Sequence, residues 1–222
     1  MTDLEVRKID WQFDAESTPF LWNEREPGFS QVANAISFLA PPLERYFVAV
    51  VRLASERIED PGAREEAEAF LRQEALHARA HRGHVRALVE QHPVLAELTD
   101  AMERSFDGLL ERESLAFHLA YMAGLEATFT PVFRAILEHE DRLFAGGDDR
   151  IASLFLWHFV EEIEHRASAL TIYRAVVPDD ALLIELFPTA FGHVVDVAQQ
   201  AFDFFVAHIP ESVRGTTDDA RP

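Results

Sequence analysis

The sequence of 222 residues contains no cysteine. This absence excludes disulfides, thiolate nucleophiles, cysteine zinc sites and iron–sulfur clusters. Neither a β-sheet pattern nor a glycine-rich phosphate loop is present. Any metal site in this chain must therefore use histidine and carboxylate ligands.

Positive charge is scarce, because 20 Lys and Arg stand against 39 Asp and Glu, for a formal net charge of −19. Nucleic acids and anionic membrane surfaces bind basic faces, so neither is expected as a partner. Residues 1–5 have no basic stretch and no apolar signal core follows them. No uncharged run reaches the roughly 20 apolar residues of a membrane span. We expect a cytoplasmic protein.

Hydrophobic residues make up 48% of the chain, which is enough for the buried core of one domain. Apolar residues recur with helical spacing along most of the chain, so the predicted class is all-α. Residues 1–29 are predicted to form an irregular N-terminal strap, residues 30–210 a helical bundle domain, and residues 211–222 a disordered tail.

Prolines, glycines and aspartates divide the helical pattern into segments. Pro41-Pro42 interrupts a helical pattern that starts at Ser30, so the first bundle helix is predicted from about Pro42 to Ile58. Asp60-Pro61-Gly62 then starts a second helix that ends at His92-Pro93. The later segments are residues 94–140 with a break at Asp107-Gly108, a helix over residues 150–177 capped by Asp149, and a helix ending at residue 208.

The helix over residues 150–177 carries Glu162 and His165 as an E-x-x-H pair. Residues three apart lie on one face of a helix, so a carboxylate and an imidazole can bind the same metal ion. The surrounding residues are apolar, and a buried charge there needs a partner. One such pair can occur by chance, so the wider pattern has to decide.

The wider pattern repeats the motif. Glu74 and His77 form a second E-x-x-H pair, Glu44 precedes it in an apolar helix, and Glu126 precedes the pair at residue 162. This order is what a ferritin-like four-helix bundle needs to hold two metal ions, with further helices at its N- and C-terminal ends. The oxygen-rich ligands suit two iron ions, or manganese or a mixed manganese–iron pair, better than zinc. The predicted metal ligands are Glu44, Glu74, His77, Glu126, Glu162 and His165.

Further residues lie beside these ligands. His158 is one helical turn before Glu162, and we predict that it is a third histidine ligand or a hydrogen-bond partner of a ligand. His81 is the matching candidate on the second helix, and Glu161 is a candidate support of the ligands. A satisfied core histidine is the alternative interpretation for both histidines.

Three strings in the chain resemble a known family. They are residues 42–47 (PLERYF), residues 73–77 (QEALH) with His81, and residues 157–166 (WHFVEEIEHR). They are similar to the bacterial ferritin-like family labelled predicted metal-dependent hydrolase, over about residues 6–176. The resemblance implies the same six ligands. A histidine commonly follows the third-helix glutamate in that family, whereas Ala127 stands here.

Three functions follow as hypotheses. The first is a dinuclear iron oxidase or oxygenase that activates O2 to oxidise a small organic substrate. The second is a metal-dependent hydrolase, in which two ions activate a water. The third is a non-catalytic iron-binding protein. The expected partners are a small-molecule substrate, O2, an electron donor and a second copy of the chain.

Overall fold

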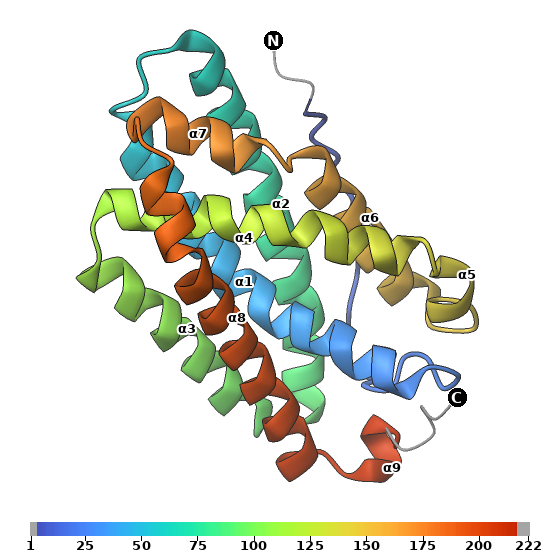
Figure 1. Cartoon of the computed structure of the whole chain (residues 1–222). Helices are drawn as coiled ribbons and strands as arrows, with labels where there is room; N and C mark the ends of the chain where they lie inside the picture. The colour runs from blue at the N-terminus through green and yellow to red at the C-terminus, as the bar shows by residue number, and fades with distance from the viewer. Residues whose placement is uncertain (1–3, 217–222) are drawn as a thin grey trace.

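The computed structural model describes residues 4–216, and this range contains helices but no strand (Figure 1). The predicted all-α class is confirmed, whereas the assignment to the ferritin-like superfamily stays a prediction. The helices are α1 (Pro27–Ser55), α2 (Pro61–Gln91), α3 (Leu95–Arg112), α4 (Leu115–Leu137), α5 (Glu140–Leu143), α6 (Asp149–Glu164), α7 (Ser168–Val176), α8 (Ala181–His208) and α9 (Glu211–Arg214).

Four helices enclose the interior in which the predicted ligands lie. α1 packs along α2 and also contacts α4, while α6 contacts both α2 and α4. The connection between α1 and α2 is short, as predicted, and the Asp60 carboxylate caps α2 by accepting a hydrogen bond from the Ala63 backbone N–H at 2.7 Å. α7 covers α2 and α4, and α8 crosses α4 and α1 on the outside (Figure 1).

The N-terminal segment described by the structure, residues 4–26, contains no helix and no strand. Its aromatic side chains tie it to the helices: Phe13, Phe20 and Trp22 are buried. The Trp11 indole N–H donates a hydrogen bond to Ser153 Oγ on α6 at 2.9 Å. This segment therefore lies on the bundle and brings its charged residues close to α6.

The predicted interruption at Pro41-Pro42 is wrong, because α1 continues through both prolines. Each proline removes a backbone hydrogen bond, at a cost of roughly 3 kcal/mol in an ordinary helix interior. α1 is packed by α2, α3, α4 and α8, and both prolines are buried. Burial along the whole helix offsets the lost hydrogen bonds, so α1 stays helical although it contains two prolines.

The predicted break at Asp107-Gly108 is also wrong. Those residues lie inside α3, where the Asp107 carboxylate accepts a hydrogen bond from Arg45 Nη2 at 2.8 Å. The chain turns instead at Glu113, and Ser114 Oγ caps α4 by accepting a hydrogen bond from the Phe117 N–H. The N-terminus of α4 is therefore set by the N-cap Ser114 and not by a break at Gly108.

The predicted helix over residues 150–177 is two helices. Asp148, not Asp149, caps α6, since its carboxylate accepts hydrogen bonds from two backbone N–H groups. α6 ends at Glu164, and a turn at His165 redirects the chain into α7. Ser168 Oγ donates a hydrogen bond to Glu66 Oε1 on α2 at 2.6 Å, so packing of α7 on α2 and α4 explains the break.

The C-terminal part differs from the prediction at one point. α8 runs to His208 as expected, but the predicted disordered tail begins with a helix, α9, over residues 211–214. Gln31 Nε2 donates a hydrogen bond to the Arg214 carbonyl oxygen at 3.3 Å, which holds α9 against α1. Residues 217–222 of that tail lie outside the described residues.

Among the helices that the structure describes, α8 is long and apolar enough, by length and composition, to cross a membrane. Length and composition alone are weak evidence for a span. The charged residues Glu185, Asp196 and Asp203 interrupt the apolar sequence of this continuous helix. The inner side of the helix packs on α4 and α1. Its outer side carries exposed Ile184, and Phe191 is 46% exposed.

Candidate metal centre

The six predicted ligands come together in the interior of the bundle. α1 supplies Glu44, α2 supplies Glu74 and His77, and α4 supplies Glu126. α6 supplies Glu162, and His165 follows its last residue. None of the six residues is more than 3% exposed. Residues as far apart in the sequence as Glu44 and His165 are thus held in one buried cluster.

Two groups of four side chains have the spacing of a metal site. In each group the candidate ligand atoms lie within 4.8 Å of one another. Glu162 and His77 belong to both groups, so the two groups overlap. Glu126 is outside both groups, but its Oε2 lies 3.2 Å from His165 Nδ1. The groups are Glu44, His77, His158 and Glu162, and Glu74, His77, Glu162 and His165.

Many ligand atoms in this cluster have no hydrogen-bond partner. Both carboxylate oxygens of Glu74 and of Glu126 lack a hydrogen bond, and so do both ring nitrogens of His165, which contact Glu126 and Glu74 only at ion-pair distances of 3.2 and 3.4 Å. Burying a polar group without a partner costs roughly 1–3 kcal/mol, and a charged one costs more. Several such atoms in one place are expected only where another group binds them. The residues present therefore fit a site for metal ions.

In the metal-free cluster, the raised pKa values of Glu126 and His158 favour the protonated forms of these side chains. Burial and the neighbouring Glu162 raise the pKa of Glu126 to about 7. Burial alone would lower the pKa of His158, but the carboxylates of Glu162 and Glu44 outweigh burial and raise this pKa to about 9. Burial also raises the pKa of Glu162, yet His165 and the other imidazoles hold it well below its usual value. A bound cation would displace these protons.

His158 contacts two of the candidate ligands. Its Nε2 lies 2.9 Å from Glu162 Oε1 and 3.3 Å from Glu44 Oε1, so it is a hydrogen-bond partner of two candidate ligands. It also belongs to the first group of four. Its further role as a ligand stays a prediction. The alternative of a core histidine bonded to a carbonyl is not what the geometry shows.

A buried polar chain fixes the orientation of His158. Its Nδ1 lies 2.8 Å from His81 Nε2, and His81 Nδ1 lies 2.8 Å from Ser37 Oγ. Ser37 Oγ is also 2.8 Å from His84 Nδ1. A hydroxyl has one proton to donate, so it can donate to only one of these rings and accepts from the other. If His158 Nε2 faces the ions, the His158 Nδ1–H donates to His81 Nε2. The His81 Nδ1–H then donates to Ser37 Oγ, and the Ser37 hydroxyl donates to His84 Nδ1.

Glu161 orients His77 from the opposite side. Its Oε2 lies 3.0 Å from His77 Nε2, while its Oε1 accepts hydrogen bonds from Trp157 Nε1 at 2.9 Å and Arg7 Nη1 at 3.2 Å. Arg7 also donates to both carboxylate oxygens of Glu164, at 2.7 and 2.8 Å. A carboxylate on the outer nitrogen of a histidine leaves the other nitrogen, here Nδ1, free to bind a metal ion.

Sequence reasoning missed three of these supporting residues. Ser37 and His84 complete the polar chain, and Arg7 fixes Glu161 from the N-terminal segment. His84 follows His77 and His81 at helical spacing, which is a signal that could have been read. Arg7 lies 154 positions from Glu161, so no local pattern connects them.

Arg7→Gln is expected to weaken metal binding by about 10- to 100-fold, the usual effect of losing a group that orients a ligand. Without the guanidinium, Glu161 keeps only one of its two donors on Oε1 and holds His77 less firmly. Competition with a chromophoric chelator measures the affinity. Arg174→Gln, which removes an exposed ion pair to Asp180, is the matched control and should leave the affinity unchanged. Equal affinities for all three proteins would contradict the role of Arg7.

Comparison with known proteins adds a family. The family model described as predicted metal-dependent hydrolase matches residues 5–216. Comparison with curated proteins and with solved structures finds no match. The matched range includes every candidate ligand and the strap residue Arg7.

Proposed function

Because the chain belongs to the predicted metal-dependent hydrolase family, we propose that it binds two divalent metal ions and hydrolyses a small organic substrate. The observation that carries this proposal is the set of buried, unpartnered carboxylate and imidazole atoms between α1, α2, α4 and α6. Four carboxylates carry about the charge that two divalent ions balance. The cluster supports metal binding more strongly than a purely structural role.

Each ion has its own set of residues in this proposal. Glu44, His77 and His158 would hold the first ion, and Glu74, Glu126 and His165 the second. Glu162 would be shared, because its Oε1 faces His158, His77 and His165 at 2.9, 3.4 and 3.5 Å. When bound, two divalent ions lower the pKa of a water and polarise the bond to be broken.

The chain's own residues supply the remaining requirements. Glu126 borders both the ligand cluster and an apolar cavity, so a substrate in the cavity would meet the ions beside this carboxylate. The polar chain through His81 and Ser37 keeps His158 in one orientation. Apolar side chains at the cavity exclude bulk water, which strengthens electrostatic interactions at the site.

A second candidate function is oxidation of the substrate with O2 by two iron ions. The donor set favours it, because four carboxylates are hard ligands that suit iron and manganese, while catalytic zinc sites more often use a histidine-rich set. The same residues would hold the ions. The two functions differ in their need for O2 and for a redox-active metal.

The decisive experiment loads the metal-free protein with zinc, manganese or iron(II) and assays ester, amide and phosphoester substrates with and without oxygen. We expect hydrolysis that continues without oxygen and is supported by a redox-inactive metal such as zinc. Iron-dependent oxygen consumption coupled to product would instead establish the second candidate. A protein that binds none of these metals would reject both functions.

A further inference from the structure

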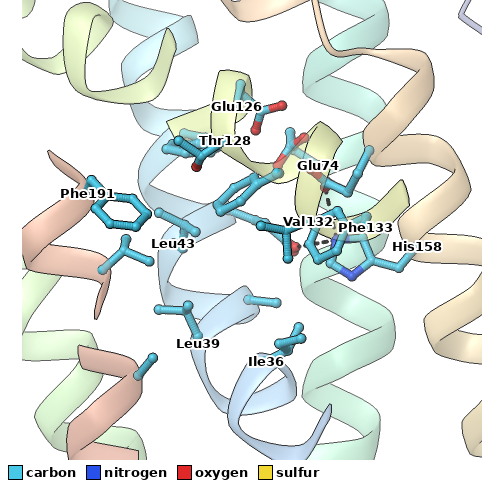
Figure 2. Close-up of a pocket in the computed structure, with 17 residues that line it drawn as sticks. Ile36, Leu39, Leu43, Glu74, Glu126, Thr128, Val132, Phe133, His158 and Phe191 are labelled. Atoms are coloured by element: carbon cyan, nitrogen blue, oxygen red, sulfur yellow. Dashed lines mark hydrogen bonds and ion pairs between the residues drawn. The ribbon is translucent and has the colours of Figure 1, made fainter. Parts of the chain in front are cut away.

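A cavity of about 210 Å³ adjoins the ligand cluster. Glu74, Glu126 and His158 lie along one side of it, and Leu39, Leu43 and Phe191 lie on the other (Figure 2). The side away from the ligands is thus built from α1 and α8 side chains that are all apolar. A molecule inside would have one end at the candidate metal ions and the rest against hydrocarbon.

The mouth of the cavity lies between α4 and α8. Val132 on α4 is 50% exposed and Phe191 on α8 is 46% exposed, yet both line the cavity. Leu39 and Leu43 on α1 line it too and are buried, so they mark its inner wall. A ligand would enter from the α4–α8 side and reach the carboxylates with its leading end.

The cavity offers almost nothing to a charged or strongly polar ligand away from the cluster. Among residues 4–216, no lysine or arginine lines it. Thr128 is its one uncharged polar side chain, and the Thr128 hydroxyl already donates a hydrogen bond to the Leu125 carbonyl oxygen at 2.7 Å. A charged or hydroxyl-rich part of a ligand would lose its hydration without new partners, which is strongly unfavourable. The part of the ligand outside the cluster must be apolar.

The volume limits the size of that apolar part. An apolar cavity of about 150 Å³ is large enough to bind benzene. The cavity here is larger, so it has room for a single ring with a short substituent, or for a hydrocarbon chain of similar volume.

We propose that the substrate has an uncharged hydrocarbon part about the size of a substituted benzene ring, that this part enters between α4 and α8, and that the reactive group of the substrate lies at the carboxylates. This inference rests on the proposed function for the reaction itself. The apolar walls, the absence of a lining cation and the volume determine the substrate class.

The test measures binding of toluene to the metal-free protein by ligand-observed NMR titration. Benzoate and phloroglucinol, which have the same ring but carry a charge or three hydroxyls, serve as comparison ligands. Toluene is expected to bind at least about tenfold more tightly than either, since neither polar ring finds partners in the cavity. Equal or tighter binding of benzoate or phloroglucinol would overturn the proposed substrate class.

Two surface variants locate the bound ligand. Val132→Trp places a large side chain at the mouth and should weaken toluene binding about tenfold or more. Val160→Trp on α6 is the matched control: Val160 is 42% exposed and does not line the cavity, so binding should be unchanged. Both sites are exposed, so both variants should fold, which circular dichroism can verify. Equal toluene affinity in the two variants would overturn the inference.

The same titrations separate this inference from the proposed function. Zinc binding, followed with a chromophoric chelator, is measured on the same samples. Zinc binding without toluene binding would reject the substrate class and leave the metal site standing. Toluene binding by a protein that binds none of zinc, manganese and iron(II) would leave an apolar ligand site but reject the hydrolase.

Discussion

Replacing Glu162 by glutamine is expected to remove both metal ions from the protein. One Glu162 oxygen faces His158, His77 and His165, and the other has no partner. The amide keeps the shape of the side chain but removes one negative charge from the centre of the cluster. Loss of a group that only orients a ligand weakens metal binding about 10- to 100-fold, so loss of a shared carboxylate should exceed about 100-fold.

Elemental analysis of protein purified from metal-supplemented cells measures this effect. The parent chain should carry about two ions. Glu126→Gln should also lower the metal content, because it leaves positive charge uncompensated in an apolar interior. Glu138→Gln, an exposed position near the end of the same helix, is the control and should keep the parent content. Parent-like metal content in both the Glu162 and Glu126 variants would reject the ligand assignment.

Removing the metal ions is expected to lower the melting temperature markedly. An ion present at about 1,000 times its Kd stabilises the folded state by about 4 kcal/mol. For a chain of this size, 1 kcal/mol shifts the melting temperature by about 2–4 °C, so the expected decrease is roughly 8–16 °C. Differential scanning calorimetry of chelator-treated and reloaded protein measures it. Identical melting temperatures would be incompatible with a buried site.

The size of this decrease should depend on pH. In the metal-free protein the His158 pKa of about 9 exceeds its unfolded value of about 6.5. A raised folded pKa gives stability that is complete below about pH 6.5 and is lost as the pH rises through 9. The pKa of Glu126 is also raised on folding, from about 4.5 to about 7, so its contribution to the stability of the folded state is lost as the pH rises from about 4.5 to 7.

Bound ions would replace these protons, so the metal-loaded protein should melt at nearly the same temperature from pH 6 to 9. The difference between loaded and metal-free protein should therefore widen over that range. A gap that narrows with rising pH would show that protons do not compete with the ions.

The helical class and the clustering of the six candidate ligands could be predicted from sequence because both depend on periodicity. An apolar pattern of 3.6 residues per turn defines the helices, and residues three or four apart share a face. Glu74 with His77 is such a pair. Once four helices share one core, the carboxylates on their inner faces must meet.

Features that depend on contacts between distant segments could not be predicted. Pro41 and Pro42 are helix breakers by local rules, and only burial along α1 explains their place inside it. The orientation of His77 depends on Glu161, and that of Glu161 on Arg7 from the strap. The cavity arises where α8 crosses α4 and α1, and no residue of α8 carries a motif.

The turn at His165 has an electrical consequence. A helix carries a macrodipole whose C-terminal end is equivalent to about half a negative elementary charge. α6 ends at Glu164, so the carbonyl groups of its last turn lie beside the cluster. A single helix continuing to residue 177 would have put that end about 20 Å farther along the axis. The interruption thus makes the peptide backbone a weak attractor of cations, worth roughly 0.3–1 kcal/mol, at the place where the carboxylates converge.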